Sequence, residues 1–143
     1  MILGGNNLSE NLNLELDAIK KAIDVYFEGI KSLDHDQIYK VFHEEANLMT
    51  TNSEGEIVIH KSSVWKDICL NTKKNIKDLN EYKVSASIAN IDLVQDTASI
   101  RVKMRMETPG RISDFNDYYH MLKIDGNWMI VAKTYHGDHQ SKQ

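Results

Sequence analysis

The chain has 143 residues, of which 41% are hydrophobic and 27% are charged, as in an ordinary single globular domain. A net charge of −4 at pH 7 argues against nucleic acid as the main partner, because binding to phosphates needs a basic surface. The lone Cys69 excludes an internal disulfide, and no membrane-length apolar run or signal-peptide pattern is present, so we expect a cytoplasmic protein.

The first predicted element is a long amphipathic helix that begins near residue 13. Residues 1–12 are polar and rich in glycine and asparagine, which is typical of a flexible N-terminal arm. After this arm, apolar side chains recur at steps of three and four residues, the period of one helix face. They are Leu16, Ile19, Ile23, Tyr26, Phe27, Ile30 and Leu33.

Two shorter helices and two short strands are predicted next. Asp34 is a suitable N-cap for a helix that carries Ile38, Val41 and Phe42 on one side. Residues 46–51 and 56–59 have the composition of strands, and residues 52–55 between them favour a turn. A third helix is expected from about residue 62, followed by a loop over residues 71–80.

From Tyr82 onwards the hydrophobic period changes to two residues, which predicts a β-sheet. The clearest signal is Asp125-Gly126, because both residues tolerate positive φ and two runs of strand-forming residues flank them. Alternation along this hairpin predicts one inward face, the lining of a partly buried pocket, and leaves Asp117 on the opposite face. The inward face would carry Tyr118, His120, Leu122 and Ile124, and then Trp128, Ile130, Ala132, Thr134 and His136.

Helices followed by an antiparallel sheet indicate an α+β fold, with the helices on one face of the sheet. The single domain is expected over residues 13–137, and residues 138–143 are expected to form a C-terminal tail. The other sheet face has too mixed a composition for plain solvent, so we expect a homodimer through this outer face. Its predicted residues are Arg101, Lys103, Arg105, Met121, Met129, Val131 and Tyr135.

Four segments carry a family resemblance that covers residues 15–136. They read AIDVYFEG (22–29), FHEEA (42–46), DYYHMLKIDGNW (117–128) and KTYH (133–136). In these segments the chain resembles the nuclear transport factor two-like superfamily, whose cone-shaped α+β barrel also serves ketosteroid isomerases and SnoaL-type cyclases. The resemblance is closest to the "putative lumazine-binding" family. It implies three N-terminal helices on the concave face of a curved, mainly antiparallel sheet, a pocket between them, and a homodimer.

Face parity and the resemblance together predict a pocket lined by aromatic side chains. The candidate ligand-binding residues are Tyr26, Phe27, Phe42, Trp65, Tyr118, His120 and Trp128. Aromatic walls suit a flat organic molecule, so the leading hypothesis is a small-molecule-binding protein with an apolar pocket inside the cone. Neither a metal nor a cofactor is expected, because the chain lacks the short-range cysteine and histidine pairs of zinc sites and any Gly-rich phosphate loop.

Two alternatives remain open at this stage. In one, a SnoaL-like lyase or isomerase without metal uses His120 for proton transfer, with Tyr26 or Tyr118 as hydrogen-bond donor. The ketosteroid isomerase reaction itself is rejected, because its base position falls on Thr50, which cannot take a proton from carbon at neutral pH. In the other, side chains fill the cone, and the protein is a non-catalytic dimeric interaction module. An internal cavity would distinguish these alternatives.

Overall fold

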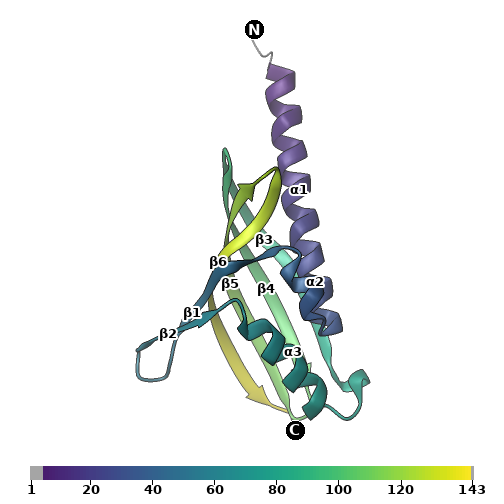
Figure 1. Cartoon of the computed structure of the whole chain (residues 1–143). Helices are drawn as coiled ribbons and strands as arrows, with labels where there is room; N and C mark the ends of the chain where they lie inside the picture. Colours follow the sequence, from purple (N-terminus) through teal and green to yellow (C-terminus); the bar gives the residue numbers. More distant parts are fainter. Residues whose placement is uncertain (1–4, 143) are drawn as a thin grey trace.

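The computed structural model describes residues 5–142, which form three α-helices, a short 3₁₀ helix and six strands (Figure 1). The helices are α1 (Gly5–Ser32), α2 (His35–Tyr39), α3 (Val64–Asn75) and the 3₁₀ helix η1 (Leu79–Glu81). The strands are β1 (Phe42–Thr51), β2 (Ile57–Lys61), β3 (Lys83–Val94), β4 (Thr97–Thr108), β5 (Arg111–Ile124) and β6 (Asn127–Ser141). Within residues 5–142, no helix combines the length and the apolar character needed to cross a membrane.

Helix α1 follows the predicted apolar period but begins earlier than predicted. Ile19, Ile23 and Tyr26 are fully buried on the face that packs against the sheet. The expectation of a flexible arm was wrong for residues 5–12, which are helical and extend beyond the sheet (Figure 1). Residues 1–4 lie outside the described residues.

A close approach between α1 and α2 depends on Gly29. Asp34 caps α2 as predicted, because its side chain accepts a hydrogen bond from the backbone nitrogen of Gln37 at 3.2 Å. A Cβ atom at position 29 would lie 2.7 Å from Cγ1 of Ile38 and 3.0 Å from its backbone nitrogen. Phe42 was expected in this helix but begins β1, since α2 ends at Tyr39. Similarly, α3 continues to Asn75, into the predicted loop.

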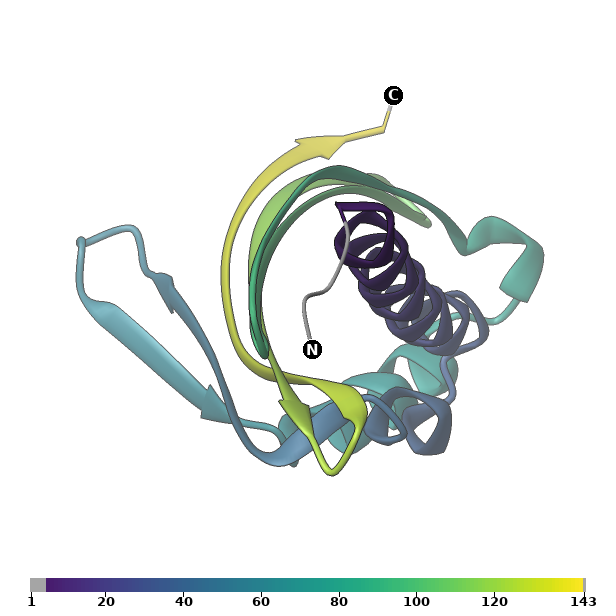
Figure 2. The ribbon, with the colours of Figure 1, turned by 90° about the horizontal axis from the view of Figure 1, so that it is seen from above.

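The six strands form one curved sheet in the order β2-β1-β6-β5-β4-β3, with a parallel β1–β6 pair and antiparallel pairs elsewhere. Viewed along α1, the sheet curls around this helix without closing, and the β1–β2 hairpin projects away from the cone (Figure 2). The predicted α+β cone is therefore confirmed, with the helices on the concave face of a mainly antiparallel sheet.

The β5–β6 hairpin turns at Asp125-Gly126, as predicted, with φ angles of 50° and 82°. However, the predicted inward face was wrong along most of the hairpin. The two-residue turn pairs Ile124 with Asn127 and Lys123 with Trp128, and cross-strand partners share a face. Because Trp128 is buried, the odd-numbered residues of β5 face inward, opposite to the prediction.

A β-bulge changes the alternation once more within β6. Met121 pairs with Ile130, whereas His120 pairs with Ala132, so Val131 is an extra residue without its own partner in β5. Trp128 and Ile130 face inward before the bulge, and after it the inward residues are odd-numbered, beginning with Lys133. Strand β6 then continues to Ser141, so the predicted tail was wrong for residues 138–141.

We expect Gly29→Ala to destabilise the fold by about 1–2 kcal/mol. Alanine favours a helix over glycine by up to about 1 kcal/mol. The new methyl group, however, meets the backbone of Ile38, and overpacking of this kind costs about 1–3 kcal/mol. Urea denaturation followed by circular dichroism measures the difference. Asp24→Ala, at an exposed site of the same helix, is the control; equal stabilities for the two variants would contradict the close approach.

Candidate functional site

A cavity of about 200 Å³ lies between α1, α3 and the concave face of the sheet. Most of its wall is apolar, and Tyr26, Trp65, Phe115 and Tyr135 contribute aromatic rings. The aliphatic wall residues are Ile30, Leu48, Ile68, Met104 and Met106. Among the described residues that line it, the ionisable side chains besides the two tyrosines are those of Asp117 and Lys133. The volume is below the roughly 300–1,000 Å³ of sites for drug-sized molecules, so a ligand here would be small.

A chain of hydrogen bonds joins α1 to β5 and β6 beside this cavity. The hydroxyl oxygens of Tyr26 and Tyr119 lie 2.9 Å apart, and the Tyr119 oxygen is 3.0 Å from Oδ2 of Asp117. Nζ of Lys133 lies 3.3 Å from the Tyr26 oxygen and 3.5 Å from Oδ2 of Asp117. Each phenol has one proton, so Lys133 donates to Tyr26, Tyr26 to Tyr119, and Tyr119 to Asp117.

Burial determines the protonation of this network. It raises the pKa of both Tyr26 and Tyr119, so these phenols stay neutral at neutral pH. Burial also raises the pKa of Asp117, although the charge of Lys133 opposes this shift. For Lys133, burial disfavours the ammonium, but the oxygens of Tyr26 and Asp117 outweigh it and raise its pKa. Lys133 therefore carries a positive charge over the physiological range.

Aromatic rings surround the Lys133 ammonium. Its nitrogen lies 5.0 Å from the centre of the Trp65 ring, 5.1 Å from that of Tyr135 and 5.5 Å from that of Tyr119. Such distances allow cation–π attraction, which compensates part of the lost hydration. The charge is thus held at a fixed place, and only 10% of the Lys133 side chain is exposed.

Two buried side-chain atoms of residues that line the cavity have no hydrogen-bond partner within residues 5–142. They are Oδ1 of Asp117 and Nε1 of Trp65. Buried polar atoms are nearly always paired in folded proteins, because an unpaired one costs about 1–3 kcal/mol. Both atoms are enclosed by protein and have almost no accessible surface, so neither is presented to the cavity.

The structure brings only some of the predicted pocket residues to the cavity. Tyr26 and Trp65 line it. Phe42 lies behind them, with its ring centre 6.1 Å from that of Tyr26. Phe27 is buried in the core, and Trp128 donates to Glu15 at 2.7 Å near the hairpin, so neither of these two lines the cavity.

The expected inward orientation of Tyr118 and His120 was wrong. Both are exposed on the outer sheet face, where Tyr118 retains 50% of its accessible surface. Asp117, expected on the outer face, is instead almost completely buried beside the cavity. Met121, also expected outside, faces inward together with Asp117, and Tyr135 faces inward because of the bulge at Val131. Had the sequence analysis paired Trp128 with Lys123 across the two-residue turn, it would have predicted correctly which residues of β5 face inward.

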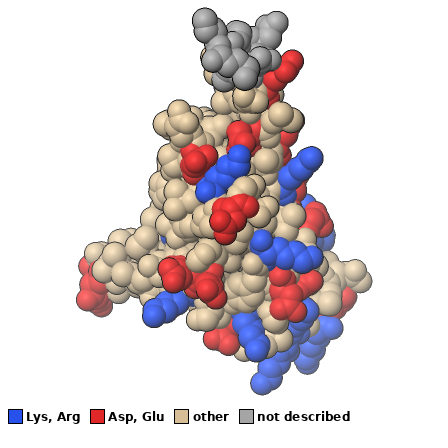
Figure 3. Space-filling view, turned by 45° about the horizontal axis from the view of Figure 1, so that its top comes forward, with Lys and Arg blue, Asp and Glu red and all other residues tan. Residues whose placement is uncertain are grey.

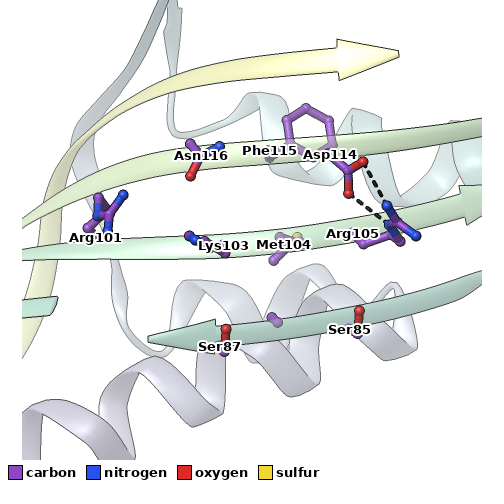
Figure 4. A pocket seen from close by; sticks show the side chains of 10 residues that line it. Ser85, Ser87, Arg101, Lys103, Met104, Arg105, Asp114, Phe115 and Asn116 are labelled. Carbon is purple, nitrogen blue, oxygen red and sulfur yellow. Dashed lines mark hydrogen bonds and ion pairs between the residues drawn. The ribbon is translucent and has the colours of Figure 1, made fainter. Parts of the chain in front are cut away.

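The outer sheet face has a shallow groove of about 390 Å³ (Figure 4). Arg101, Lys103 and Arg105 lie along it as predicted, and Arg105 makes two bonds to Asp114 at 2.8 and 3.0 Å. Lys103 and Arg105 are exposed and Arg101 is half-buried. Elsewhere, acidic and basic groups are interspersed on the surface in Figure 3. The groove therefore has less to fix a small ligand than the inner cavity, and the homodimer contact expected on this face stays a prediction.

Comparison with known proteins places this site in a family context. The sequence profile of a family described as putative lumazine-binding matches residues 15–136. An NTF2-like protein of unknown function from Shewanella baltica is 25% identical, with a TM-score of 0.71 over 87% of this chain and 94% of that one. A ketosteroid isomerase-like protein from Erwinia carotovora is 12% identical, with a TM-score of 0.64 over 86% and 95%, so it shares the fold alone.

One curated relative matches a shorter segment. Aldolase FrzH from a Cladobotryum species is 34% identical over 55 residues. The match spans 38% of this chain and 42% of that protein, so it is a likeness over less than half of either molecule.

We expect Lys133→Met to destabilise the protein by about 3–5 kcal/mol. The substitution leaves the Asp117 carboxylate buried without its counter-charge, and an unpaired buried charge carries a penalty of this size. Asp117→Leu combined with Lys133→Met removes both charges and should recover most of the loss in urea denaturation. Lys123→Met, which breaks the more exposed pair with Glu15, is the control and should cost less. Equal losses in the two single variants would contradict the buried-pair assignment.

The loss of unfolding free energy in Lys133→Met, relative to the wild type, should also depend on pH. The ammonium normally lowers the pKa of Asp117, so its removal raises that pKa further above the unfolded value. The folded variant then binds a proton where the unfolded chain does not, and its unfolding free energy increases as the pH falls. Denaturation at pH 5 and pH 8 should show a smaller deficit at pH 5. If the loss of unfolding free energy is the same at both pH values, the unpaired Asp117 carboxylate is not its cause.

Proposed function

The chain belongs to the putative lumazine-binding family, and on that premise we propose that it binds a small organic molecule in the cavity inside the cone. The observation that carries the proposal is a cavity of about 200 Å³ whose mainly apolar wall includes the buried pair of Asp117 and Lys133. A ligand that fills the cavity would bury its apolar part against the aromatic and aliphatic side chains of this wall. Small-molecule pockets are mostly apolar and contain a few polar groups that fix the orientation of the ligand.

The cavity weighs against the alternative of a filled cone. Met104 and Met106, which are flexible enough to fill gaps, line the space and leave about 200 Å³ between them and the aromatic wall. A dry apolar core at normal packing density has few voids larger than a water molecule. The interaction-module hypothesis therefore has less support than ligand binding.

The enzyme alternative depended on His120, which does not line the inner cavity. His120 lies on the outer sheet face and lines only a shallow surface depression with β3 and β4. A proton-transfer group must reach its substrate within hydrogen-bond distance, directly or through one water. The titratable groups that do face the cavity are Asp117 and Lys133, and they enter the proposal as ligand-binding residues.

Native mass spectrometry of freshly purified protein, compared with the same sample after denaturation, tests the proposal. A small molecule that is released on denaturation supports it, and its mass narrows the chemical class. The same spectra report the homodimer predicted from the outer sheet face. Absence of a released molecule, together with no stabilisation by a library of small heterocycles in thermal denaturation, would contradict the proposal.

We expect Met106→Trp to reduce the fraction of ligand-bound protein by more than half. Met106 is half-buried in the cavity wall, so the larger indole would occupy part of the space that a ligand needs. Met129→Trp makes the same exchange at a half-buried site that pairs with the exposed Leu122, outside the cavity. This control should keep the wild-type fraction in native mass spectra. Equal occupancy in both variants would place the ligand elsewhere.

A further inference from the structure

We infer that the β1–β2 hairpin of one copy of this chain docks, through its acidic tip, into the basic groove on the outer sheet face of a second copy. The basic groove is the outer-face groove that contains Arg101 and Lys103, and the acidic tip consists of Glu54 and Glu56. The inference goes beyond the proposed function, because it concerns the face of the sheet opposite the inner cavity.

Two cationic side chains of the basic groove have no acidic partner in their own chain. Arg105 is neutralised by Asp114, through the contacts at 2.8 and 3.0 Å. None of the ion pairs within residues 5–142 includes Arg101 or Lys103. These two residues share one face of β4 and lie about 7 Å apart along the strand (Figure 4). The groove therefore presents two positive charges that an acidic group from another molecule could neutralise.

The side chains beside these cations are neutral. Lys103 lies between Ser87 of β3 and Asn116 of β5, and Arg101 lies beside Tyr118 of β5, because cross-strand partners share a face. Serine, asparagine and tyrosine can all donate hydrogen bonds. A carboxylate that enters the groove would thus meet two cations and additional donors, the surroundings in which charge-assisted hydrogen bonds form.

The tip of the β1–β2 hairpin has the complementary charge. Residues 49–59 include Glu54 and Glu56 but no lysine or arginine, and both glutamates are exposed. Figure 3 shows acidic side chains at the end of this projection. Oδ1 of Asn52 accepts hydrogen bonds from the backbone nitrogens of both glutamates at 3.0 Å, and its Nδ2 donates to the Glu56 carboxylate at 3.2 Å. The tip is therefore ordered before docking, which lowers the entropic cost of binding.

The hairpin also exposes apolar side chains on the side that continues the outer sheet face. Leu48 lines the inner cavity, so the next residue, Met49, faces outward, and Ile59 pairs with Met49 across the hairpin. Ile57 and Ile59 keep 67% and 55% of their surface exposed on a hairpin that projects away from the cone (Figure 2). Contact with a second copy would bury this apolar surface and so add hydrophobic stabilisation to the charge pairs.

Two-fold symmetry can bring the hairpin and the basic groove together. The hairpin lies at the β2 end of the strand order β2-β1-β6-β5-β4-β3, and the basic groove lies at the β3 end. A two-fold axis that runs along the strands, between two outer faces, places the β2 end of one copy opposite the β3 end of the other. Each dimer would then contain the hairpin–groove contact twice. Because two copies with a net charge of −4 repel each other overall, these local attractions would select this orientation.

Reversing the charges on each side separately tests the inference. Arg101→Glu/Lys103→Glu gives an acidic groove and an acidic tip, and Glu54→Lys/Glu56→Lys gives a basic groove and a basic tip. In sedimentation equilibrium, the dimer of each variant should dissociate at least ~10-fold more readily than that of the wild type, because like charges meet at both contacts. An equimolar mixture of the two variants should form a heterodimer, since both of its contacts again join opposite charges. Native mass spectrometry identifies this heterodimer by its mass.

Lys73→Glu/Lys74→Glu is the matched control. It makes the same change in net charge as the groove variant, but at exposed positions in the last turn of α3, away from the outer sheet face. It should dimerise like the wild type. Circular dichroism checks that every variant is folded. Raising the sodium chloride concentration from about 50 to about 500 mM should weaken the wild-type dimer, because salt screens exposed charge pairs.

A wild type that stays monomeric would overturn the inference and leave the basic groove to an acidic partner other than this chain. Reversed variants that dimerise like the wild type, or a mixture that forms no heterodimer, would overturn it as well, because the outer faces would then associate without the hairpin–groove contact. None of these outcomes bears on the proposed function, which depends on the molecule released from the inner cavity.

Discussion

The extra residue in β6 is the constraint on which the inner surface of this protein depends. In a regular strand, Trp128 and Ile130 would share their face with Ala132 and Thr134, and Lys133 would point outward. The bulge at Val131 reverses this alternation, so that Trp128 and Ile130 complete the apolar core while Lys133 enters the cavity. The same irregularity bends the strand, since bulges increase local curvature, and so lets one strand serve both the hairpin and the parallel pairing with β1.

The buried hydrogen-bond network exists because the bulge turns Lys133 toward the interior. Lys133 from β6 meets Asp117 and Tyr119 from β5, and Tyr26 from α1 completes the chain, so three separate elements hold one charge pair. Every hydroxyl in the chain has a donor on one side and an acceptor on the other. Within residues 5–142, Oδ1 of Asp117 is left without a hydrogen-bond partner. The network therefore holds the charge pair in place without satisfying every atom of it.

The sequence predicted the first helix, its neighbouring cap and the hairpin turn far better than it predicted which strand residues face the interior. The three- and four-residue period of α1, the cap at Asp34 and the turn at Asp125-Gly126 are local signals, and local backbone preferences were enough to locate them. The orientation of β5 depends on which residue pairs with which across the turn, and an offset of one residue placed His120 inside and Asp117 outside. A bulge leaves no reliable trace in composition. Therefore Lys133, whose charge argues for the surface, could not be assigned to the interior from the chain alone.

The parallel pairing of β1 with β6 also determines when the chain can complete its folding during synthesis. Thr50 donates to the carbonyl oxygen of Tyr135 at 2.8 Å, at a sequence separation of 85 residues. Leu48 of β1 and Lys133 of β6 line the same cavity. A nascent chain can form α1 and the β3–β4 hairpin early, but β1 has no inner neighbour until β6 has left the ribosome. Contacts of such long sequence separation slow folding, and the apolar face of the first half stays open to chaperones and to other nascent chains until then.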